Sequence, residues 1–387
     1  MKILFVPETP DCWRSGIWFH RISAPATALS ERGHHVKQLS MGEFSEADLN
    51  WPDVVIFGRT YYSGHEPVKW MNEFKKRGKR VLYDMDDDFW EVAKSNPSVT
   101  VSNALKDQYE SLSRAADAII TPSKELARKF KKHFKKQVFI APNGIDFKVY
   151  RPPVNKDPMV GDRLVIGYMG GSSHWEDMGL IVDVLEELNT RHDFIFSLYG
   201  ICGTPIESEI YHYERYLNMN AQPERNAYFK AAIDFHSRLK NLKMMHIPFM
   251  PPELHPTILS QASFDIGLAP LMDTEFNRGK SCIKFYEYAS TGAVTLASDV
   301  EPYASEVNYR AKNTKKDWVN KLEKLIVDEE FRRKIYKEQY DYVYKERNIG
   351  GVADPEKPEK FHPGIGLDWE LACQLPGGLS VANQRRD

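Results

Sequence analysis

An α/β protein built from two Rossmann-like domains is predicted by three features of the sequence. Short apolar runs alternate with amphipathic stretches, the alternation stops in a segment rich in Pro and Asn, and it then begins again. With 387 residues, 42% of them apolar, the chain is long enough for about two domains of ordinary size. We expect a first domain at residues 1–155, a second at residues 160–335, and a C-terminal helix and tail at residues 336–387 that pack back on the first domain.

The first half of the chain contains five apolar runs typical of parallel strands, which are buried on both faces. These runs are KILFV (2–6), DVVIFG (53–58), RVLYD (80–84), DAIITP (117–122) and QVFIAPN (137–143). The segments HRISAPATALSERG (20–33) and EPVKWMNEFKKRG (66–78) lie between them and have helical patterns. Gly78 ends the second as a helix C-cap does.

The second half repeats this alternation after a predicted linker near residues 150–158. Its apolar runs are LVIGYMGG (164–171), FIFSLYG (194–200), LKMMHI (242–247), FDIGLAP (264–270) and AVTLAS (293–298), with a helix expected from about residue 176. A second open parallel sheet is therefore predicted. Ligands of such sheets bind at the carboxyl ends of the strands, so the loops there are the first place to seek function.

Composition excludes several classes of protein. The net charge of −2 gives no general attraction to nucleic acid or membrane. Four widely spaced cysteines without a CxxC pair favour reduced thiols over a disulfide or zinc framework. We find no apolar run of membrane-spanning length and no signal-peptide core, and therefore expect a cytoplasmic protein.

Two glycine-containing loops follow predicted strands. In the first, Gly16 would let the backbone approach a ligand and Arg21 would reach a phosphate or carboxylate. In the second, GYMGGSSHWED, Gly170 and Gly171 leave space for an anion at a helix N-terminus that Ser172 or Ser173 caps. The spacing GxGxxG is absent, which disfavours dinucleotide binding but leaves phosphate binding open. Gly16, Arg21, Gly170, Gly171 and Ser172 are therefore candidates for binding a phosphate-containing ligand.

The richest segment is NRGKSCIKFYEYASTG at residues 277–292, where a helix is expected from about residue 281. If the helix extends back to Lys280, then Lys280, Lys284 and Glu287 share one face. Two cations would then hold a diphosphate, while the carboxylate accepts hydrogen bonds from sugar hydroxyls. An ion pair on a solvated surface is the other interpretation of this spacing. We place His174, and no other histidine, near this diphosphate-containing ligand.

Four stretches in order resemble the GT-B retaining glycosyltransferases of glycosyltransferase family 4. They are LSERGHHV, ADAIITPSKELARKF, APNGIDFKVYRP and FDIGLAPLMDTEFNRGKSCIKFYEYASTGAVTLAS, within about residues 1–345. The resemblance implies that the second domain binds a nucleotide-diphosphate sugar, that the first mainly holds the acceptor, and that anomeric configuration is retained. It implies no metal cofactor.

The resemblance also assigns individual residues. Glu287 matches the second acidic residue of the family's E-x7-E motif, which binds ribose, but Gly279 stands where the first acidic residue is expected. Contacts to the transferred sugar would then come from Asn277 or from backbone N–H groups around Gly279 and Ser281. The family's usual Arg after the glycine-rich loop is absent, which leaves the diphosphate to Lys280, Lys284 and Arg21.

The function that follows is transfer of a hexose from a nucleotide-diphosphate sugar, with a UDP-sugar such as UDP-glucose favoured. A glycan, a lipid-linked sugar and a hydroxylated DNA base are all open as the hydroxyl acceptor. The alternatives are a Mg-dependent phosphohydrolase resembling the haloacid dehalogenases and a non-catalytic protein that binds a nucleotide or sugar.

The acidic segment VLYDMDDDFW at residues 81–90 is central to these alternatives. It follows a strand of the first domain, so its carboxylates should border the cleft between domains. We expect Asp84 or Asp86 to orient the acceptor hydroxyl, and Lys284 to stabilise the leaving diphosphate as the third catalytic residue. A metal site, a phosphatase nucleophile and a simple helix cap by Asp87 or Asp88 are the competing interpretations.

A basic amphipathic helix is predicted at residues 124–136. Leu126, Phe130 and Phe134 recur every four residues and would anchor it, leaving most of its Lys and Arg side chains outward. This face would meet an anionic membrane, which would make the protein peripheral at the inner membrane face, or nucleic acid. A plainly solvated face is the simpler interpretation.

Overall fold

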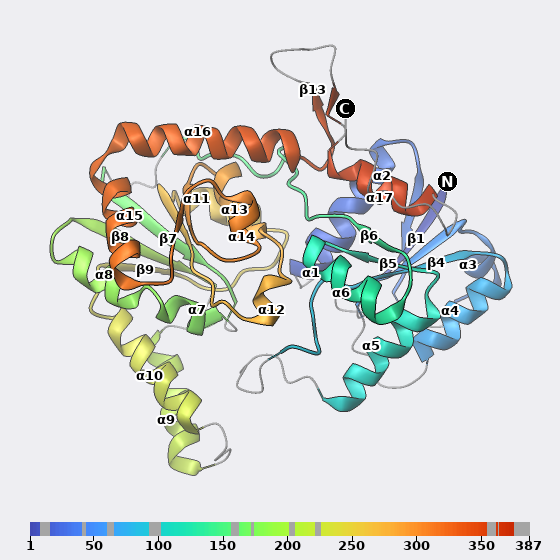
Figure 1. Cartoon of the computed structure of the whole chain (residues 1–387), viewed down its shortest axis with the longest axis horizontal. Coiled ribbons are helices and arrows are strands. Elements are labelled where there is room, and N and C mark those ends of the chain that lie inside the picture. Colours follow the sequence, from blue (N-terminus) through green and yellow to red (C-terminus); the bar gives the residue numbers. More distant parts are fainter. Residues whose placement is uncertain are drawn as a thin grey trace.

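Two Rossmann-like domains lie side by side in the chain, as Figure 1 shows. This computed structural model describes residues 1–7, 16–40, 44–59, 66–92, 102–155, 162–171, 174–200, 206–220, 226–353, 361–362 and 364–374. Each domain contains one six-stranded sheet with helices on both faces. The predicted fold class is confirmed.

The first sheet is parallel and has the strand order β2-β1-β3-β4-β5-β6. Its strands are β1 (Lys2–Val6), β2 (His35–Gln38), β3 (Val54–Phe57), β4 (Arg80–Asp84), β5 (Ala118–Thr121) and β6 (Val138–Ile140). The sequence predicted all of these except β2, whose largely exposed residues at the sheet edge lack a continuous apolar run.

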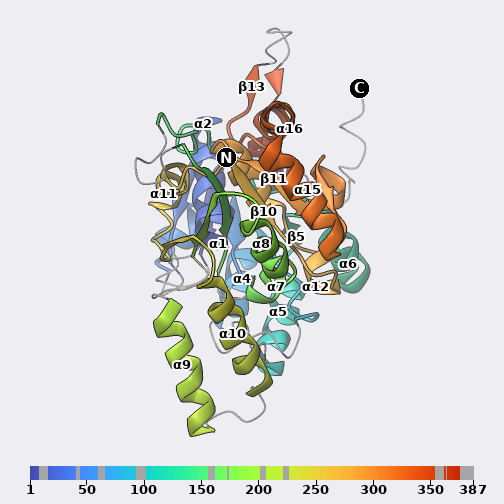
Figure 2. The same ribbon diagram turned by 90° about the vertical axis from the view of Figure 1, so that its left-hand side faces the viewer.

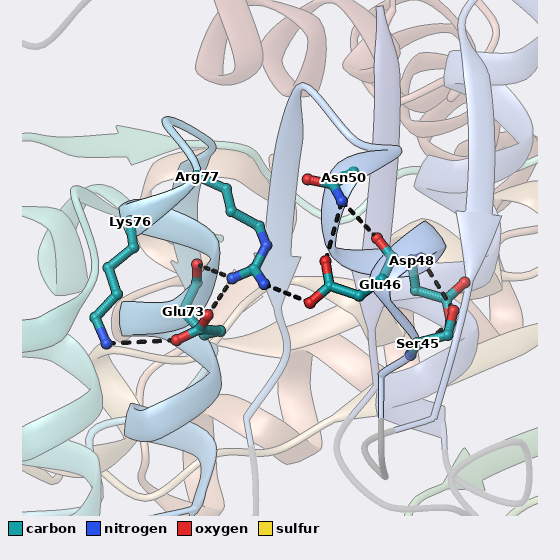
Figure 3. A network of polar contacts seen from close by, with 7 residues as sticks. All are labelled: Ser45, Glu46, Asp48, Asn50, Glu73, Lys76 and Arg77. Atoms are coloured by element: carbon teal, nitrogen blue, oxygen red, sulfur yellow. Dashed lines mark hydrogen bonds and ion pairs between the residues drawn. The ribbon is translucent and has the colours of Figure 1, made fainter.

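The helices of the first domain cover both faces of this sheet. They are α1 (Gly16–Trp18), the π-helical turn η2 (Phe19–Ser23), α2 (Ala24–Glu31), α3 (Glu46–Asn50), α4 (Glu66–Lys76), α5 (Asn103–Ala115) and α6 (Lys124–Phe134). Figure 3 shows how α3 and α4 are joined at the surface: Arg77 binds both Glu73 and Glu46, with 2.8 Å to Glu46 Oε1. Ser45 forms a capping box with Asp48 at the start of α3.

The second sheet is also parallel, with the order β12-β11-β10-β7-β8-β9. Its strands are β7 (Leu164–Met169), β8 (Phe194–Tyr199), β9 (Met244–Ile247), β10 (Ile266–Ala269), β11 (Val294–Ser298) and β12 (Arg310–Ala311). The five long apolar runs of the second half therefore form its five main strands, and the short β12 adds an edge.

The helices of the second domain are α7 (Trp175–Gly179), α8 (Val182–Asn189), α9 (Ile206–Met219), α10 (Asn226–Leu239), α11 (His255–Gln261), α12 (Glu275–Arg278), α13 (Ile283–Ser290), α14 (Tyr303–Glu306), α15 (Lys315–Val327) and α16 (Glu329–Glu346). In Figures 1 and 2, α9 and α10 pair and extend away from the sheet. The remaining helices pack closer to the strands that they connect.

The chain crosses between the domains twice, and the two crossings pair. The N–H of Ile145 donates to the carbonyl of Arg347 at 2.8 Å. The N–H of Ile349 donates to the carbonyl of Ile145 at 2.9 Å. Helix α16 packs on α13, α15 and β11, so the boundary expected between residues 335 and 336 falls inside a helix of the second domain.

After the second crossing, β13 (Val352–Ala353) and β14 (Phe361–His362) form a short antiparallel pair. Helix α17 (Ile365–Gln374) then packs on α2 and β6 of the first domain. Its Trp369 is fully buried, with its ring 6.0 Å from that of Phe5. The end of the chain beyond residue 374 lies outside the described residues.

Candidate donor site between the two domains

A cavity of about 200 Å³ opens where the carboxyl ends of β7, β8 and β9 face the first domain. Both domains contribute to its wall. The lining residues are Gly16, Phe19 and His20 from the first domain, and Met169, Gly170, Gly171, Tyr199, Gly200, Phe249, Met250, Pro252, His255, Ile283, Lys284 and Glu287 from the second. The strand ends of an open α/β sheet are the usual place for a ligand.

Glu287 is the buried carboxylate of this cavity. Its Oε1 accepts a hydrogen bond of 2.7 Å from the hydroxyl of Tyr150 and lies 2.8 Å from Nε2 of His255 and 3.3 Å from Nε2 of His20. Burial alone would raise the pKa of Glu287, but the nearby His255 and His20 outweigh it and lower the pKa below the ordinary value. The side chain is thus a fixed anion at the cavity wall.

Lys284 is the cation of the cavity and lies one helical turn before Glu287 on α13. Its Nζ is 5.8 Å from the ring centre of Tyr168. Burial, and then the charge of Lys280, lower the pKa of Lys284 to about 8. A diphosphate beside Lys284 would favour its charged form, because the negative charge offsets the repulsion from Lys280.

Lys280 precedes α13 rather than belonging to it. The helix begins at Ile283, so Lys284 and Glu287 lie on it but Lys280 does not. The expected helical face of all three residues is therefore not formed. Lys280 does not line the cavity, yet its charge acts on Lys284 and on His174. It therefore lies close enough to add to the positive potential beside the cavity.

The glycine-rich turn after β7 forms part of the cavity wall through Gly170 and Gly171. The neighbouring Gly200 has a φ of +84°, and a Cβ there would lie 3.0 Å from the carbonyl oxygen of Gly170. This close approach of the ends of β7 and β8 requires glycine. Ser172 lies outside the described residues.

His174 does not line the cavity. Its Nδ1 is 2.8 Å from Oδ2 of Asp177, and the pKa of His174 falls to about 3 because of burial and the charges of Lys284 and Lys280. The ring is therefore neutral at pH 7. It orients Asp177, whose Oδ1 accepts a 2.8 Å hydrogen bond from the N–H of Met272.

Known structures share the fold of this chain, although no family model matches it and no curated protein does. A sucrose-phosphate synthase from Thermosynechococcus elongatus superposes with a TM-score of 0.60 at 10% identity. HepE from Anabaena, in complex with UDP, gives 0.57 at 11%, and an alpha-glucosyltransferase in complex with UDP and DNA containing an HMU base gives 0.57 at 13%. Each comparison covers 90% of this chain and 96% of the other.

The chain has the GT-B fold. At such low identity the likeness shows the fold alone. The cavity between the two domains is the cleft of this GT-B protein.

Arg21 and Asp84 do not face this cleft, so the roles expected for them in donor binding and catalysis need correction. They form a buried pair, with 3.0 Å from Nε to Oδ2 and 2.5 Å from Nη2 to Oδ1. Arg21 also donates to the carbonyl of Ala141 and lies 4.7 Å from the ring centre of Trp369. Both are structural residues, because the donors and acceptors they use all point into the first domain.

The rest of the acidic segment lies nearer the second domain. Nη1 of Arg59 is 3.2 Å from Oδ1 of Asp86 and 3.5 Å from Oδ2 of Asp87. Burial and the negative charge of Asp86 raise the pKa of Asp87 to about 6, and Lys280 acts in the opposite direction. Asp86 does not line the cavity, and its ion pair with Arg59 lies within the first domain.

Two predicted donor ligands, Gly279 and Ser281, instead contact the first domain. The carbonyl of Gly279 accepts a 2.8 Å hydrogen bond from Ser123 of the first domain, and a Cβ on Gly279 would lie 2.9 Å from a methyl group of Leu126. Ser281 Oγ accepts a 3.0 Å bond from Asn143. Neither residue lines the cavity, so their expected contact with the donor stays a prediction.

Asn277 is buried and also serves the protein backbone. Its Nδ2 donates to the carbonyl of Met272 at 2.9 Å, and its N–H donates to Thr274 Oγ1 at 3.1 Å. These bonds shape the loop before α12. Asn277 is thus a residue that fixes the loop, and it does not line the cavity.

The sequence analysis missed two histidines of the cavity, whereas His174, the one histidine expected near the donor, does not line it. His20 and His255 both line the cavity and both contact Glu287. Their spacing carried no signal, because one lies in each domain. The sequence feature that could have pointed to them is that each histidine follows the loop after a predicted strand.

No group of three or more His, Cys, Asp or Glu side chains within the described ranges is placed to hold a metal ion. Likewise, no helix of the described residues has the length and apolar character that would span a bilayer.

Proposed function

We propose that this GT-B protein is a retaining glycosyltransferase that transfers a hexose from a UDP-sugar to a hydroxyl acceptor. The observation that carries the proposal is the interdomain cavity in which Lys284 and Glu287 stand one helical turn apart. Solved structures of the same fold add support, since HepE is in complex with UDP and glucose and the alpha-glucosyltransferase with UDP-glucose and DNA.

The geometry suits a nucleotide-diphosphate sugar. The ribose hydroxyls would donate to Oε2 of Glu287, since the contacts of this carboxylate with Tyr150, His255 and His20 all end on Oε1. The diphosphate would lie by Lys284 and the glycine turn at Gly170 and Gly171. When UDP departs, negative charge develops on phosphate oxygens, and a preorganised cation in a closed site stabilises it.

Retention needs no pair of catalytic carboxylates in this scheme. The acceptor hydroxyl would attack from the face that the leaving phosphate occupies, and a phosphate oxygen of UDP would take its proton. The direct test is release of UDP from UDP-glucose, UDP-galactose and UDP-N-acetylglucosamine by the purified protein, with product anomers resolved by NMR. Binding of UDP without any turnover would favour a non-catalytic protein instead.

Asp86→Asn is expected to reduce transfer to the acceptor much more than it reduces UDP affinity, because Asp86 belongs to the first domain, which we propose holds the acceptor. The probes are a panel of a glycan, a lipid-linked sugar and hydroxymethylated DNA, with Asp107→Asn on the exposed face of α5 as the matched control. UDP release without acceptor should persist in excess EDTA. Activity that EDTA abolishes and Mg²⁺ or Mn²⁺ restores would make the acidic segment a metal site.

The exposed face of α6 gives a test of anionic acceptors. Lys131, Lys132 and Lys135 are exposed and make no ion pair with a described residue, whereas Lys129 binds Asp88 and Glu275. We expect the triple Gln variant to lose salt-sensitive binding to DNA or to anionic vesicles while UDP release is unchanged.

The control for this variant removes the same charge elsewhere. Lys312, Lys316 and Lys334 are exposed on the second domain and are replaced by Gln together. Equal binding by both triple variants and the unchanged protein would leave the α6 face as a solvated surface.

A further inference from the structure

His20 belongs to the first domain yet lines the donor cavity. It lies in the π-turn η2, where the N–H of Ala24 donates to the carbonyl of Phe19. Pro25 follows directly and has no N–H for the carbonyl of Arg21, four residues earlier, which explains why the regular helix is interrupted here. Within this turn His20 lines the cavity while its neighbour Arg21 is buried in the first domain.

The ring of His20 crosses the cleft to the second domain. Its Nε2 lies 3.3 Å from Oε1 of Glu287, and only 12% of the His20 side chain is exposed. The other ring nitrogen, Nδ1, is buried without a hydrogen-bond partner among the described residues. The Nε2 contact is therefore the polar interaction that orients this ring toward α13.

Three described groups bind Oε1 of Glu287, and they have different origins. Tyr150 comes from the segment that joins the domains, and His255 lies on α11 of the second domain. His20 is the member of this set that the first domain carries. The His20–Glu287 contact therefore joins the two domains across the cleft.

We propose that His20 is a positioning residue: by holding Oε1 of Glu287 across the closed cleft, it keeps Oε2 directed at the ribose hydroxyls of the donor nucleotide. The inference rests on the proposed function and deepens it. A carboxylate that is fixed at one oxygen presents the other in a defined direction, in the way that an outer partner orients a metal ligand. Recognition of a ribonucleotide is then coupled to closure of the domains.

Two variants of similar size separate positioning from packing. The side-chain amide of His20→Gln reaches the position of Nε2 and still donates to Oε1, whereas the shorter amide of His20→Asn reaches only the position of Nδ1. His192→Ala is the matched control, because His192 is a partly buried histidine 2.8 Å from Glu323, far from the cavity. Thermal unfolding of all variants checks that each is folded.

The measurement is calorimetric affinity for UDP and for 2′-deoxy-UDP, both with the full chain. The unchanged protein and His20→Gln should prefer UDP by about tenfold, the range expected for one hydrogen bond to a charged group. His20→Asn should bind UDP about tenfold more weakly and show almost no preference, because Glu287 no longer faces the ribose. His192→Ala should match the unchanged protein.

Two results would overturn the inference and are distinguishable. If His20→Asn kept the full preference for UDP over 2′-deoxy-UDP, His20 would have no positioning role while the proposed function stood. If the unchanged protein bound neither nucleotide, the proposed function itself would fall, and the inference with it.

Discussion

Replacing Glu287 by glutamine is expected to weaken the binding of UDP by roughly 10-fold to 100-fold, because a neutral amide cannot accept charge-assisted hydrogen bonds from the ribose. Glutamine has the same size as glutamate, so the cavity keeps its shape. The change also leaves His20, His255 and Tyr150 without their common anion. Calorimetry with UDP measures the effect.

The control for Glu287→Gln is Glu323→Gln. Glu323 also contacts a histidine, His192, at 2.8 Å, but this pair lies in the second domain away from the cavity. Both variants should unfold cooperatively, and only the Glu287 variant should lose affinity. Unchanged UDP affinity in a folded Glu287→Gln protein would remove this carboxylate from the donor site.

Replacing Lys284 by methionine should have the second large effect. Methionine preserves most of the apolar stem but removes the charge, so UDP affinity should fall roughly 10-fold to 100-fold and release of UDP from UDP-glucose should slow further. Lys334→Met, an exposed lysine on α16, is the matched control. Uridine, which lacks phosphate, should bind the Lys284 variant and the unchanged protein equally well.

The same lysine predicts a pH dependence. Burial and the charge of Lys280 lower the pKa of Lys284 to about 8, and the anionic diphosphate favours the charged form. UDP affinity should therefore be full below pH 8 and fall as the pH rises through it. Lys284→Met should lack this fall. A titration between about pH 7 and about pH 9.5, where ordinary lysines stay charged, shows the difference; identical pH profiles would contradict the role given to Lys284.

The strands could be predicted from sequence because buried parallel strands are almost uniformly apolar. The runs at residues 164–171 and 194–200 became β7 and β8, and Gly170, Gly171 and Gly200 ended at the cavity as strand-end glycines should. Edge strands gave no such signal. The exposed β2 was therefore missed, although its parallel pairing with β1 is regular.

The candidate site was only partly predictable, because charge and position in a loop do not fix direction. Arg21 and Asp84 have the residue types of a phosphate ligand and a catalytic acid, yet they satisfy each other inside the first domain. Gly279 and Ser281 stand beside Lys284 in sequence but contact the first domain. Such pairings join residues more than 60 positions apart, and local spacing carries no information about them.

The two histidines of the cavity could not be predicted from local spacing either. His20 and His255 are separated by most of the chain, and neither has the spacing of a motif. The packing of the two domains against each other brings both histidines to Oε1 of Glu287. A carboxylate that is buried in a cleft needs such partners, so the prediction of Glu287 implied that partners exist without saying which residues they are.

The most direct test of the account is a crystal structure of the protein with UDP. We predict the nucleotide in the interdomain cavity, with ribose hydroxyls within hydrogen-bond distance of Glu287 Oε2 and the diphosphate beside Lys284 and Gly171. UDP bound outside this cavity, or in it with the ribose turned away from Glu287, would contradict the assignment of the donor site.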